Sequence, residues 1–172
     1  YEVAVSLRDH PLNPQELLEF VAEADAVICL LTDKIDAHVM NAAGDSLKII
    51  ANYAVGFDNV DLIEAKSRGI EVTNTPSDII CQAVAEHAVT LILSLAKRIV
   101  EADKYVKDGA YKGWDPNLLI GSELRGKTLG IIGLGRIGSL AGKLGAAWGM
   151  KISYTGPSRK EEFEKECGGR FG

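Results

Sequence analysis

The chain has 172 residues, of which 47% are hydrophobic and 25% are charged, and its formal net charge is −5. This length suits one or two small domains. The sequence has no long basic run of the kind that binds the phosphates of nucleic acid. Its three cysteines, Cys29, Cys81 and Cys167, form no CxxC pair, which disfavours zinc ribbons and redox dithiols. We expect reduced thiols in a cytoplasmic protein, no apolar stretch long enough to cross a bilayer, and no signal peptide before the first strand.

The first 75 residues alternate between strand-like and helix-like patterns. Strands are predicted at 1–7, 26–31, 47–53 and 70–74, and helices at 13–24, 36–44 and 59–69. Asn13 and Pro14 are typical of a helix start, and Gly44 and Gly69 of helix ends. This alternation predicts an α/β fold with a parallel sheet and helices on both faces, in which the apolar run 26–31 is a strand covered on both sides.

The pattern changes after Pro76. From Gln82 to about Lys107 there is no glycine or proline, and a wide apolar face predicts one long helix, an interdomain helix or a dimer interface. A loop rich in Gly, Trp and Tyr follows at 108–124. We then expect a strand at 126–133, a helix from 136 to about 148, a strand at 150–156 and a polar helix or loop at 158–169.

A glycine-rich turn, Gly-Leu-Gly-Arg-Ile-Gly, occupies residues 133–138. In a βαβ dinucleotide site, the glycine at Gly133 permits the tight turn, Gly135 lets the pyrophosphate approach the backbone, and Gly138 lets helix and strand pack closely. Arg136 and Ile137 open the helix, whose N–H groups and partial positive charge favour phosphate. Because a strand precedes the turn and a second strand follows at the right distance, we predict a dinucleotide site; a glycine-rich turn without ligand is the alternative.

The second strand of this unit lacks the acidic residue that an NAD site normally places about 20 residues beyond the turn. No carboxylate lies between Trp148 and Lys160, and the segment instead reads Ser158, Arg159, Lys160. A hydroxyl and two cations suit the 2′-phosphate of NADP through charge-assisted hydrogen bonds. We therefore predict NADP as the cofactor, with NAD possible. In the alternative interpretation, Arg159 and Lys160 are a solvated helix start that pairs with Glu161 and Glu162.

Four ordered stretches carry a family resemblance: ANYAVGFDNVDL, GIEVTNTP, ELRGKTLGIIGLGRIG and WGMKISYTG. Together they resemble the D-isomer-specific 2-hydroxyacid dehydrogenases, and within these the glyoxylate/hydroxypyruvate reductases. The resemblance implies a flavodoxin-like substrate lobe over 1–75 and a partial Rossmann lobe, a doubly wound parallel sheet, over 76–172. It also implies a homodimer through the helix 82–107 and the loop 108–124.

The same resemblance implies site residues. Ala54, Val55 and Gly56 match the loop whose backbone N–H groups hold the substrate carboxylate, and a glycine after a strand can expose such donors. The alternative is an ordinary turn in which Asp58 or Asn59 caps the next helix. Val84 matches a position near the nicotinamide.

Glu86 and His87 form no acid–base pair in this interpretation, since neighbouring residues on a helix do not face each other. The family's His also lies beyond the glycine turn, so we expect a structural role for His87.

The catalytic Arg, Glu and His of the family have no match, so we expect no catalytic residue in this span. The 172 residues look like an internal span of a chain roughly twice as long, folded incompletely at its edges and inactive alone. The expected activity of the parent protein is NAD(P)H-dependent reduction of a small 2-oxo acid such as glyoxylate or hydroxypyruvate. The alternatives are an NAD-dependent phosphoglycerate, formate or phosphite dehydrogenase, or a non-catalytic dinucleotide sensor of the corepressor type.

Overall fold

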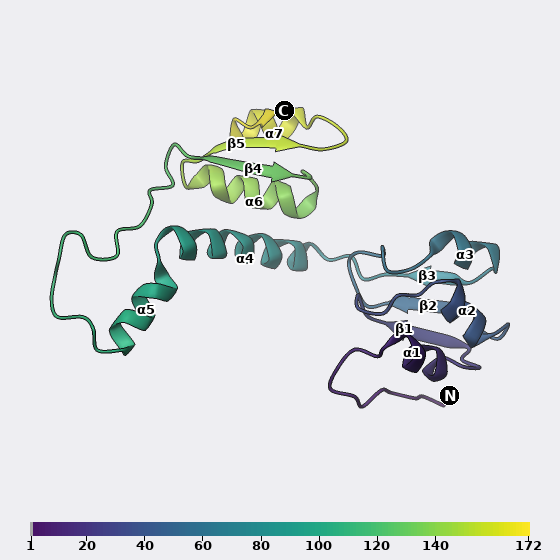
Figure 1. The fold of residues 1–172 in the computed structure, drawn as a ribbon. Helices are drawn as coiled ribbons and strands as arrows, with labels where there is room; N and C mark the ends of the chain where they lie inside the picture. The colour runs from purple at the N-terminus through teal and green to yellow at the C-terminus, as the bar shows by residue number, and fades with distance from the viewer. Residues whose placement is uncertain (1) are drawn as a thin grey trace. The chain divides into compact units, whose positions relative to one another are not determined.

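The computed structural model describes residues 2–172, and the chain divides into two compact units, Tyr1–Ser77 and Asp78–Gly172. The first unit alternates helices and strands (Figure 1): α1 (Pro14–Phe20), β1 (Ala26–Cys29), α2 (Ala37–Ala43), β2 (Ile49–Asn52), α3 (Leu62–Ser67) and β3 (Glu71–Thr73). Its sheet has the order β1-β2-β3 and both pairings are parallel. The strand–helix alternation of the sequence therefore predicts this part of the fold correctly.

The helices of the first unit cover one face of its sheet, whereas the sequence predicts coverage of both faces. Cys29 and Ile50 pack on this face into a core with buried residues from all three helices, such as Leu17, Met40 and Ala65. On the opposite face, Ile28 is 81% exposed. The strand order β1-β2-β3 advances in one direction, and right-handed crossovers then place α2 and α3 on the same side of the sheet; α1, which precedes β1, packs into the same core.

The predicted first strand, 1–7, is also wrong for the residues that the structure describes, while Tyr1 lies outside them. Residues 2–7 have no strand structure, and the side chains of Val3, Val5 and Leu7 are exposed. The apolar alternation satisfies the local pattern of a strand, but a strand also needs a neighbouring ladder of backbone hydrogen bonds. No pairing joins this segment to β1, β2 or β3.

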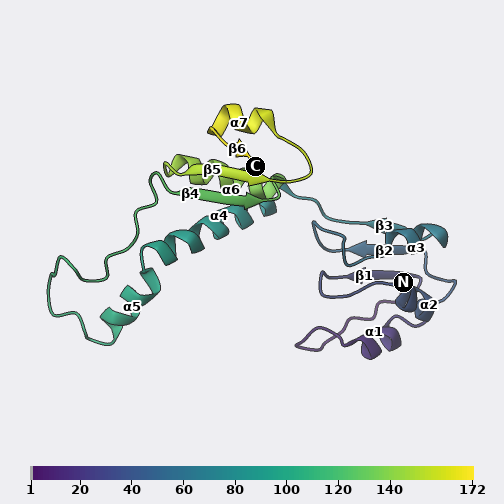
Figure 2. The same cartoon turned by 45° about the horizontal axis from the view of Figure 1, so that its top comes forward.

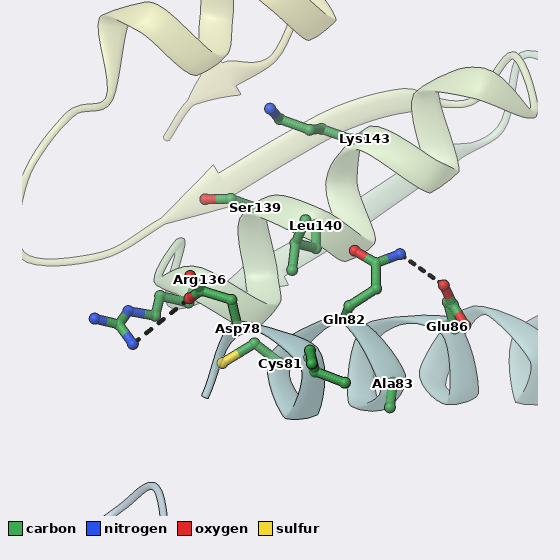
Figure 3. Close-up of a pocket in the computed structure, with 10 residues that line it drawn as sticks. Asp78, Cys81, Gln82, Ala83, Glu86, Arg136, Ser139, Leu140 and Lys143 are labelled. Atoms are coloured by element: carbon green, nitrogen blue, oxygen red, sulfur yellow. Dashed lines mark hydrogen bonds and ion pairs between the residues drawn. The ribbon is translucent and has the colours of Figure 1, made fainter. Parts of the chain in front are cut away.

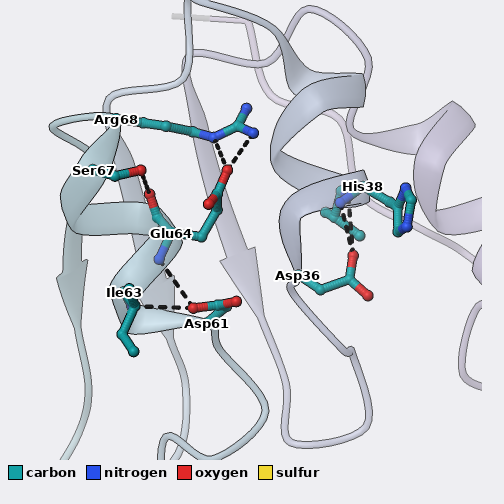
Figure 4. A network of polar contacts seen from close by, with 8 residues as sticks. Asp36, His38, Asp61, Ile63, Glu64, Ser67 and Arg68 are labelled. Atoms are coloured by element: carbon teal, nitrogen blue, oxygen red, sulfur yellow. Dashed lines mark hydrogen bonds and ion pairs between the residues drawn. The ribbon is translucent and has the colours of Figure 1, made fainter.

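Short side chains cap the helices of the first unit. Asn13 caps α1 as predicted, in a reciprocal capping box with Glu16. Figure 4 shows the carboxylate of Asp36 accepting hydrogen bonds from the first turn of α2, and that of Asp61 doing the same for α3. Asp61, and not Asp58 or Asn59, is therefore the N-cap of α3, and Asn59 is free for another role.

The caps also affect ionisation. Burial by itself would raise the pKa of Asp36, but the N–H groups of Val39 and His38, together with Lys34, outweigh it and hold the pKa below its usual value.

The second unit begins with two helices, α4 (Asp78–Ala96) and α5 (Ile99–Lys107), followed by a long loop. Its sheet and remaining helices (Figure 1, Figure 2) are β4 (Thr128–Ile132), α6 (Arg136–Ala147), β5 (Lys151–Thr155), α7 (Glu161–Cys167) and β6 (Arg170–Phe171). The strands are parallel in the order β4-β5-β6. The core contains Leu134, Ile152, Tyr154 and Phe163. On the other face of β4, Ile132 is 93% exposed.

The predicted single helix at 82–107 is two helices in the structure, and the first begins earlier, at Asp78. The break falls at Arg98, whose φ of 55° is left-handed. The Ala96 carbonyl, which a continuous helix would pair with the N–H four residues later, instead accepts a hydrogen bond from Ser122 N at 2.7 Å. Lys97 and Glu123 add an ion pair beside it at 2.8 Å. Contacts with the following loop therefore end α4.

Helix α4 has the length and apolar composition of a membrane span, so the expectation that no stretch is long enough is wrong on that ground. The same two properties occur in helices that pack inside globular proteins, and a single such helix carries little weight. In this structure α4 packs along α6, with Cys81, Ala85 and Val89 buried.

Candidate functional site

The glycine turn joins β4 to α6 with the geometry that each glycine requires. Gly133 has a φ of +92°, a left-handed conformation that side chains rarely adopt, and Gly135 is the N-cap of α6. A Cβ on Gly138 would collide with the Gly133 carbonyl oxygen and lie 3.2 Å from Ile131 Cγ2. The turn is therefore tight at its first glycine and closely packed at its last.

The first turn of α6 offers unpaired donors. The N-cap Gly135 supplies no side-chain hydrogen bond, and the N–H groups of Arg136, Ile137 and Gly138 have no acceptor within residues 2–172. No acidic residue occupies this turn. Free N–H groups at the positive end of a twelve-residue helix suit an anionic phosphate.

An open groove of about 740 Å³ lies between this turn with the start of α6 and residues 159–166, which follow β5 and include most of α7. Four of the predicted cofactor residues line it: Gly135, Arg136, Arg159 and Lys160. Residues 24 positions apart in the sequence thus meet beside the helix N-terminus, because β4 and β5 are parallel neighbours whose C-terminal ends share one edge. Gly133, Ile137, Gly138 and the exposed Ser158 lie near the groove in sequence but do not line it.

Arg159 is held by a carboxylate that the sequence does not single out. Its guanidinium donates to both oxygens of Glu164, at 2.6 Å from Nη2 and 3.0 Å from Nε. The pairing with Glu161 or Glu162 in the alternative interpretation is therefore not the one observed. The hydrogen bond from Arg159, followed by that from Tyr154, holds the pKa of Glu164 below its usual value.

Tyr154 forms hydrogen bonds that connect the Arg159–Glu164 pair to the backbone of Lys160. Its ring is buried, with 2% exposed, and its hydroxyl donates to Glu164 at 2.8 Å while accepting from Lys160 N at 2.8 Å. Both predicted cations therefore lie on a segment that a buried side chain anchors. Within residues 2–172, the Lys160 ammonium makes no ion pair. The groove that it lines also contains Lys143 and the carboxylates of Glu161, Glu162 and Glu166, of which Glu166 pairs with Lys143.

A second groove, of about 650 Å³, lies between α4 and α6 (Figure 3). Arg136 points toward Asp78 across it, with 3.8 Å between their charged atoms, and Gln82 donates to Glu86 at 2.7 Å along α4. Glu86 thus pairs with Gln82 and not with the exposed His87. Arg136 is the one predicted site residue lining this groove; Val84, 44% exposed on α4, does not.

The predicted substrate loop follows β2 in the first unit. Ala54 is buried, whereas Val55 and Gly56 are partly exposed. A Cβ on Gly56 would lie 3.2 Å from Asp58 Oδ1, so a side chain there would have to displace that carboxylate. Three asparagine side chains surround this loop, and the sequence pattern assigns no such role to Asn52, Asn59 or Asn74. The one signal for it is the asparagine that ends the apolar strand IIAN.

Comparison with known proteins decides the family. The model of the D-isomer specific 2-hydroxyacid dehydrogenase, catalytic domain, matches residues 1–165. The chain belongs to this family. The resemblance drawn from the four sequence stretches is thereby confirmed, including the likeness to glyoxylate reductases.

Two relatives of this 2-hydroxyacid dehydrogenase chain are the glyoxylate reductases of Thermococcus onnurineus and Aeropyrum pernix. They are 43% and 47% identical to it, each over 99% of this chain and 52% of their own length. The chain thus spans about half the length of the curated relatives it matches.

Solved structures agree on the fold. The TT0316 protein from Thermus thermophilus has a TM-score of 0.79 at 40% identity, covering 95% of this chain and 55% of that one. A D-lactate dehydrogenase from Aquifex aeolicus, solved with NAD and lactic acid, has a TM-score of 0.79 at 30% identity, covering 90% of this chain and 45% of its own. The predicted α/β class with a Rossmann-type parallel sheet is confirmed.

Proposed function

We propose that the intact protein reduces a small 2-oxo acid, glyoxylate or hydroxypyruvate, to the 2-hydroxy acid with NADPH. One observation carries the cofactor part of this proposal: the groove beside the glycine turn also contains the cations Arg159 and Lys160. Relatives with more than 40% identity that are glyoxylate reductases support the substrate class.

The residues of the second unit fit a dinucleotide. The unpaired N–H groups of Arg136, Ile137 and Gly138 would receive the pyrophosphate, with Gly133 and Gly135 keeping the backbone open to it. Ser158, Arg159 and Lys160 would bind the 2′-phosphate, and Val84 would lie near the nicotinamide. The bound cofactor supplies the hydride.

In the first unit, the N–H groups of the loop at Ala54, Val55 and Gly56 would hold the substrate carboxylate. The residues that bind the 2-oxo group and move the proton, an Arg, a Glu and a His in this family, have no matching segment in residues 1–172. We therefore expect the isolated 172-residue chain to show no meaningful turnover of glyoxylate.

We also propose a homodimer through residues 82–107, which include most of α4 and all of α5, and the loop 108–124. Large apolar side chains are exposed along this region, among them Leu95 at 79%, Val100 at 73% and Trp114 at 83%. Exposed apolar side chains on two helices and on the loop after them favour a protein partner. Sedimentation of the intact protein tests this: we expect a dimer that Leu95→Glu weakens, and a wild-type monomer at micromolar concentration would refute it.

The cofactor proposal is tested by fluorescence titration of the intact protein with NADPH and NADH. We expect NADPH to bind at least tenfold more tightly, because only NADPH gives Arg159 and Lys160 a phosphate partner. Equal or tighter binding of NADH would refute the NADPH preference. Glyoxylate turnover at saturating NADPH tests the reaction in the same preparation.

A further inference from the structure

The substrate loop of the first unit is held by all three of its peptide carbonyls. Each accepts a hydrogen bond from a group outside residues 54–56. The pairs are Ala54 O with Thr75 N at 2.8 Å, Val55 O with Asn74 Nδ2 at 2.8 Å, and Gly56 O with Asn52 Nδ2 at 2.9 Å. Two of these three donors are asparagine side chains.

Anchoring the carbonyls determines where the N–H groups point. In a trans peptide the C=O and the following N–H lie in one plane and point in opposite directions, and no cis peptide occurs within residues 2–172. The bonds to Ala54 O and Val55 O therefore turn the N–H groups of Val55 and Gly56 away from Thr75 and Asn74. Within residues 2–172 neither N–H has an acceptor. The loop presents two neighbouring free donors, as a carboxylate requires.

Asn52 is built into the core beneath this loop. It is 1% exposed and is the one fully buried polar residue among those described. Its Oδ1 accepts from Cys29 Sγ at 3.3 Å and from Asn59 Nδ2 at 3.2 Å, and its Nδ2 also donates to Asn59 Oδ1 at 3.1 Å. A buried amide is costly unless its hydrogen bonds are made, and here both ends have partners.

Asn59 extends the network to a second loop. Its Nδ2 donates to the carbonyls of Leu30 and Asp33, at 3.1 and 3.0 Å, in the segment that follows β1. The two asparagines thus join the segments after β1 and β2 at the same edge of the sheet, and the amide of Asn52 transmits this anchoring to Gly56.

We propose that Asn52, supported by Asn59, is a positioning residue for carboxylate binding. It does not touch the substrate. Its bond to Gly56 O fixes the last peptide plane of the loop, between Gly56 and Phe57, and so holds the end of the loop in place while Thr75 N and Asn74 orient the N–H groups of Val55 and Gly56 toward the ligand. The inference rests on the proposed function, because it takes the ligand to be a small 2-oxo acid.

The test is the variant Asn52→Ala in the intact protein, with Cys29→Ala as the matched control. Cys29 is also buried and bonds to Asn52, but it makes no contact with the loop carbonyls. We expect Asn52→Ala to raise KM for glyoxylate at least tenfold at saturating NADPH, with the Kd of NADPH unchanged. We expect Cys29→Ala to lower Tm while KM stays within twofold.

A KM for glyoxylate in Asn52→Ala equal to that of the wild type would overturn the inference, since a role in folding alone predicts a lower Tm without a change in KM. If Asn52→Ala does not fold, Asn59→Ala gives the same readout with its partly exposed side chain. We expect it to raise KM severalfold, and an unchanged KM there would likewise overturn the inference.

A binding measurement separates this inference from the proposed function. Glyoxylate without cofactor should shift the NMR amide signals of Val55 and Gly56 in the wild type, and Asn52→Ala should need about tenfold more glyoxylate for the same shift. Shifts without any turnover would refute the proposed reaction and leave the positioning role supported. Wild-type amides that do not respond to glyoxylate would overturn the positioning role.

Discussion

The hydroxyl of Tyr154 lies 2.8 Å from Glu164 Oε1, and this contact connects β5 to α7. Because Glu164 also holds Arg159, the buried tyrosine determines where a cation of the candidate cofactor groove is placed. A strand that contributes to the core thereby also positions a charge at the surface.

Replacing Arg159 with alanine should weaken the binding of NADPH selectively. A hydrogen bond to a charged group contributes about 1.5–3 kcal/mol, which corresponds to roughly a ten- to hundredfold rise in Kd. Fluorescence titration should show this rise for NADPH and little change for NADH. Lys165→Ala removes a cation from exposed α7 outside the groove and serves as the control. Equal losses for both cofactors would contradict a 2′-phosphate contact.

The variant Gly138→Ala should be unstable and should bind the dinucleotide poorly. Its Cβ would collide with the Gly133 carbonyl, and forcing extra atoms into a packed site costs about 1–3 kcal/mol. Gly130→Ala is the matched control, because a Cβ at that position on β4 meets nothing within 4 Å. Thermal unfolding with and without NADPH measures both effects. A Tm for Gly138→Ala as high as that of the control would show that the turn is less tightly packed than described.

The ion pair between Glu164 and Arg159 should stabilise the protein only above acid pH. The pKa of Glu164 is lowered in the folded state, so its stabilisation is complete above the unfolded value of about 4.3. It is lost as the pH falls through the lower folded value. We therefore expect the Tm difference between the wild type and Glu164→Gln to be constant from pH 7 to 5 and to shrink below pH 4. A difference that persists at pH 3 would argue against the charged pair as its source.

The thiol of Cys29 should resist alkylation in the native protein. Burial, and secondly the charge of Asp33, raise the pKa of Cys29 to about 11, and the thiolate is the reactive form. With iodoacetamide at pH 7.5, we expect mass spectrometry to find the partly exposed Cys167 labelled first and Cys29 unlabelled. Denaturation in urea should expose both residues equally. Native labelling of Cys29 as fast as Cys167 would mean that its surroundings open readily.

Local patterns were sufficient to predict the parts of this protein that depend on few neighbours. The order of strands and helices follows from apolar periodicity, and the turn at Gly133, Gly135 and Gly138 is recognisable because each glycine meets a backbone requirement of its own. The cap at Asn13 is local in the same sense. The family stretches added the identity of the fold, which the comparisons confirm.

Other features depend on contacts between residues far apart in the sequence. The end of α4 is determined by the hydrogen bond between Ala96 O and Ser122 N, which no helix propensity shows. The segment 2–7 has the alternation of a strand but no neighbouring strand to pair with. Likewise, Glu161, Glu162 and Glu164 all follow Arg159 within five residues of the sequence, and in the structure Arg159 pairs with Glu164, which also accepts from the Tyr154 hydroxyl.

By itself, the sequence determined the α/β pattern and the glycine turn, because periodicity and backbone conformation act within a few residues. Only the tertiary structure decided which side chains support the two candidate sites. Asn59 reaches the Leu30 carbonyl, 29 positions away in the sequence, because parallel strands bring their C-terminal ends to one edge of the sheet.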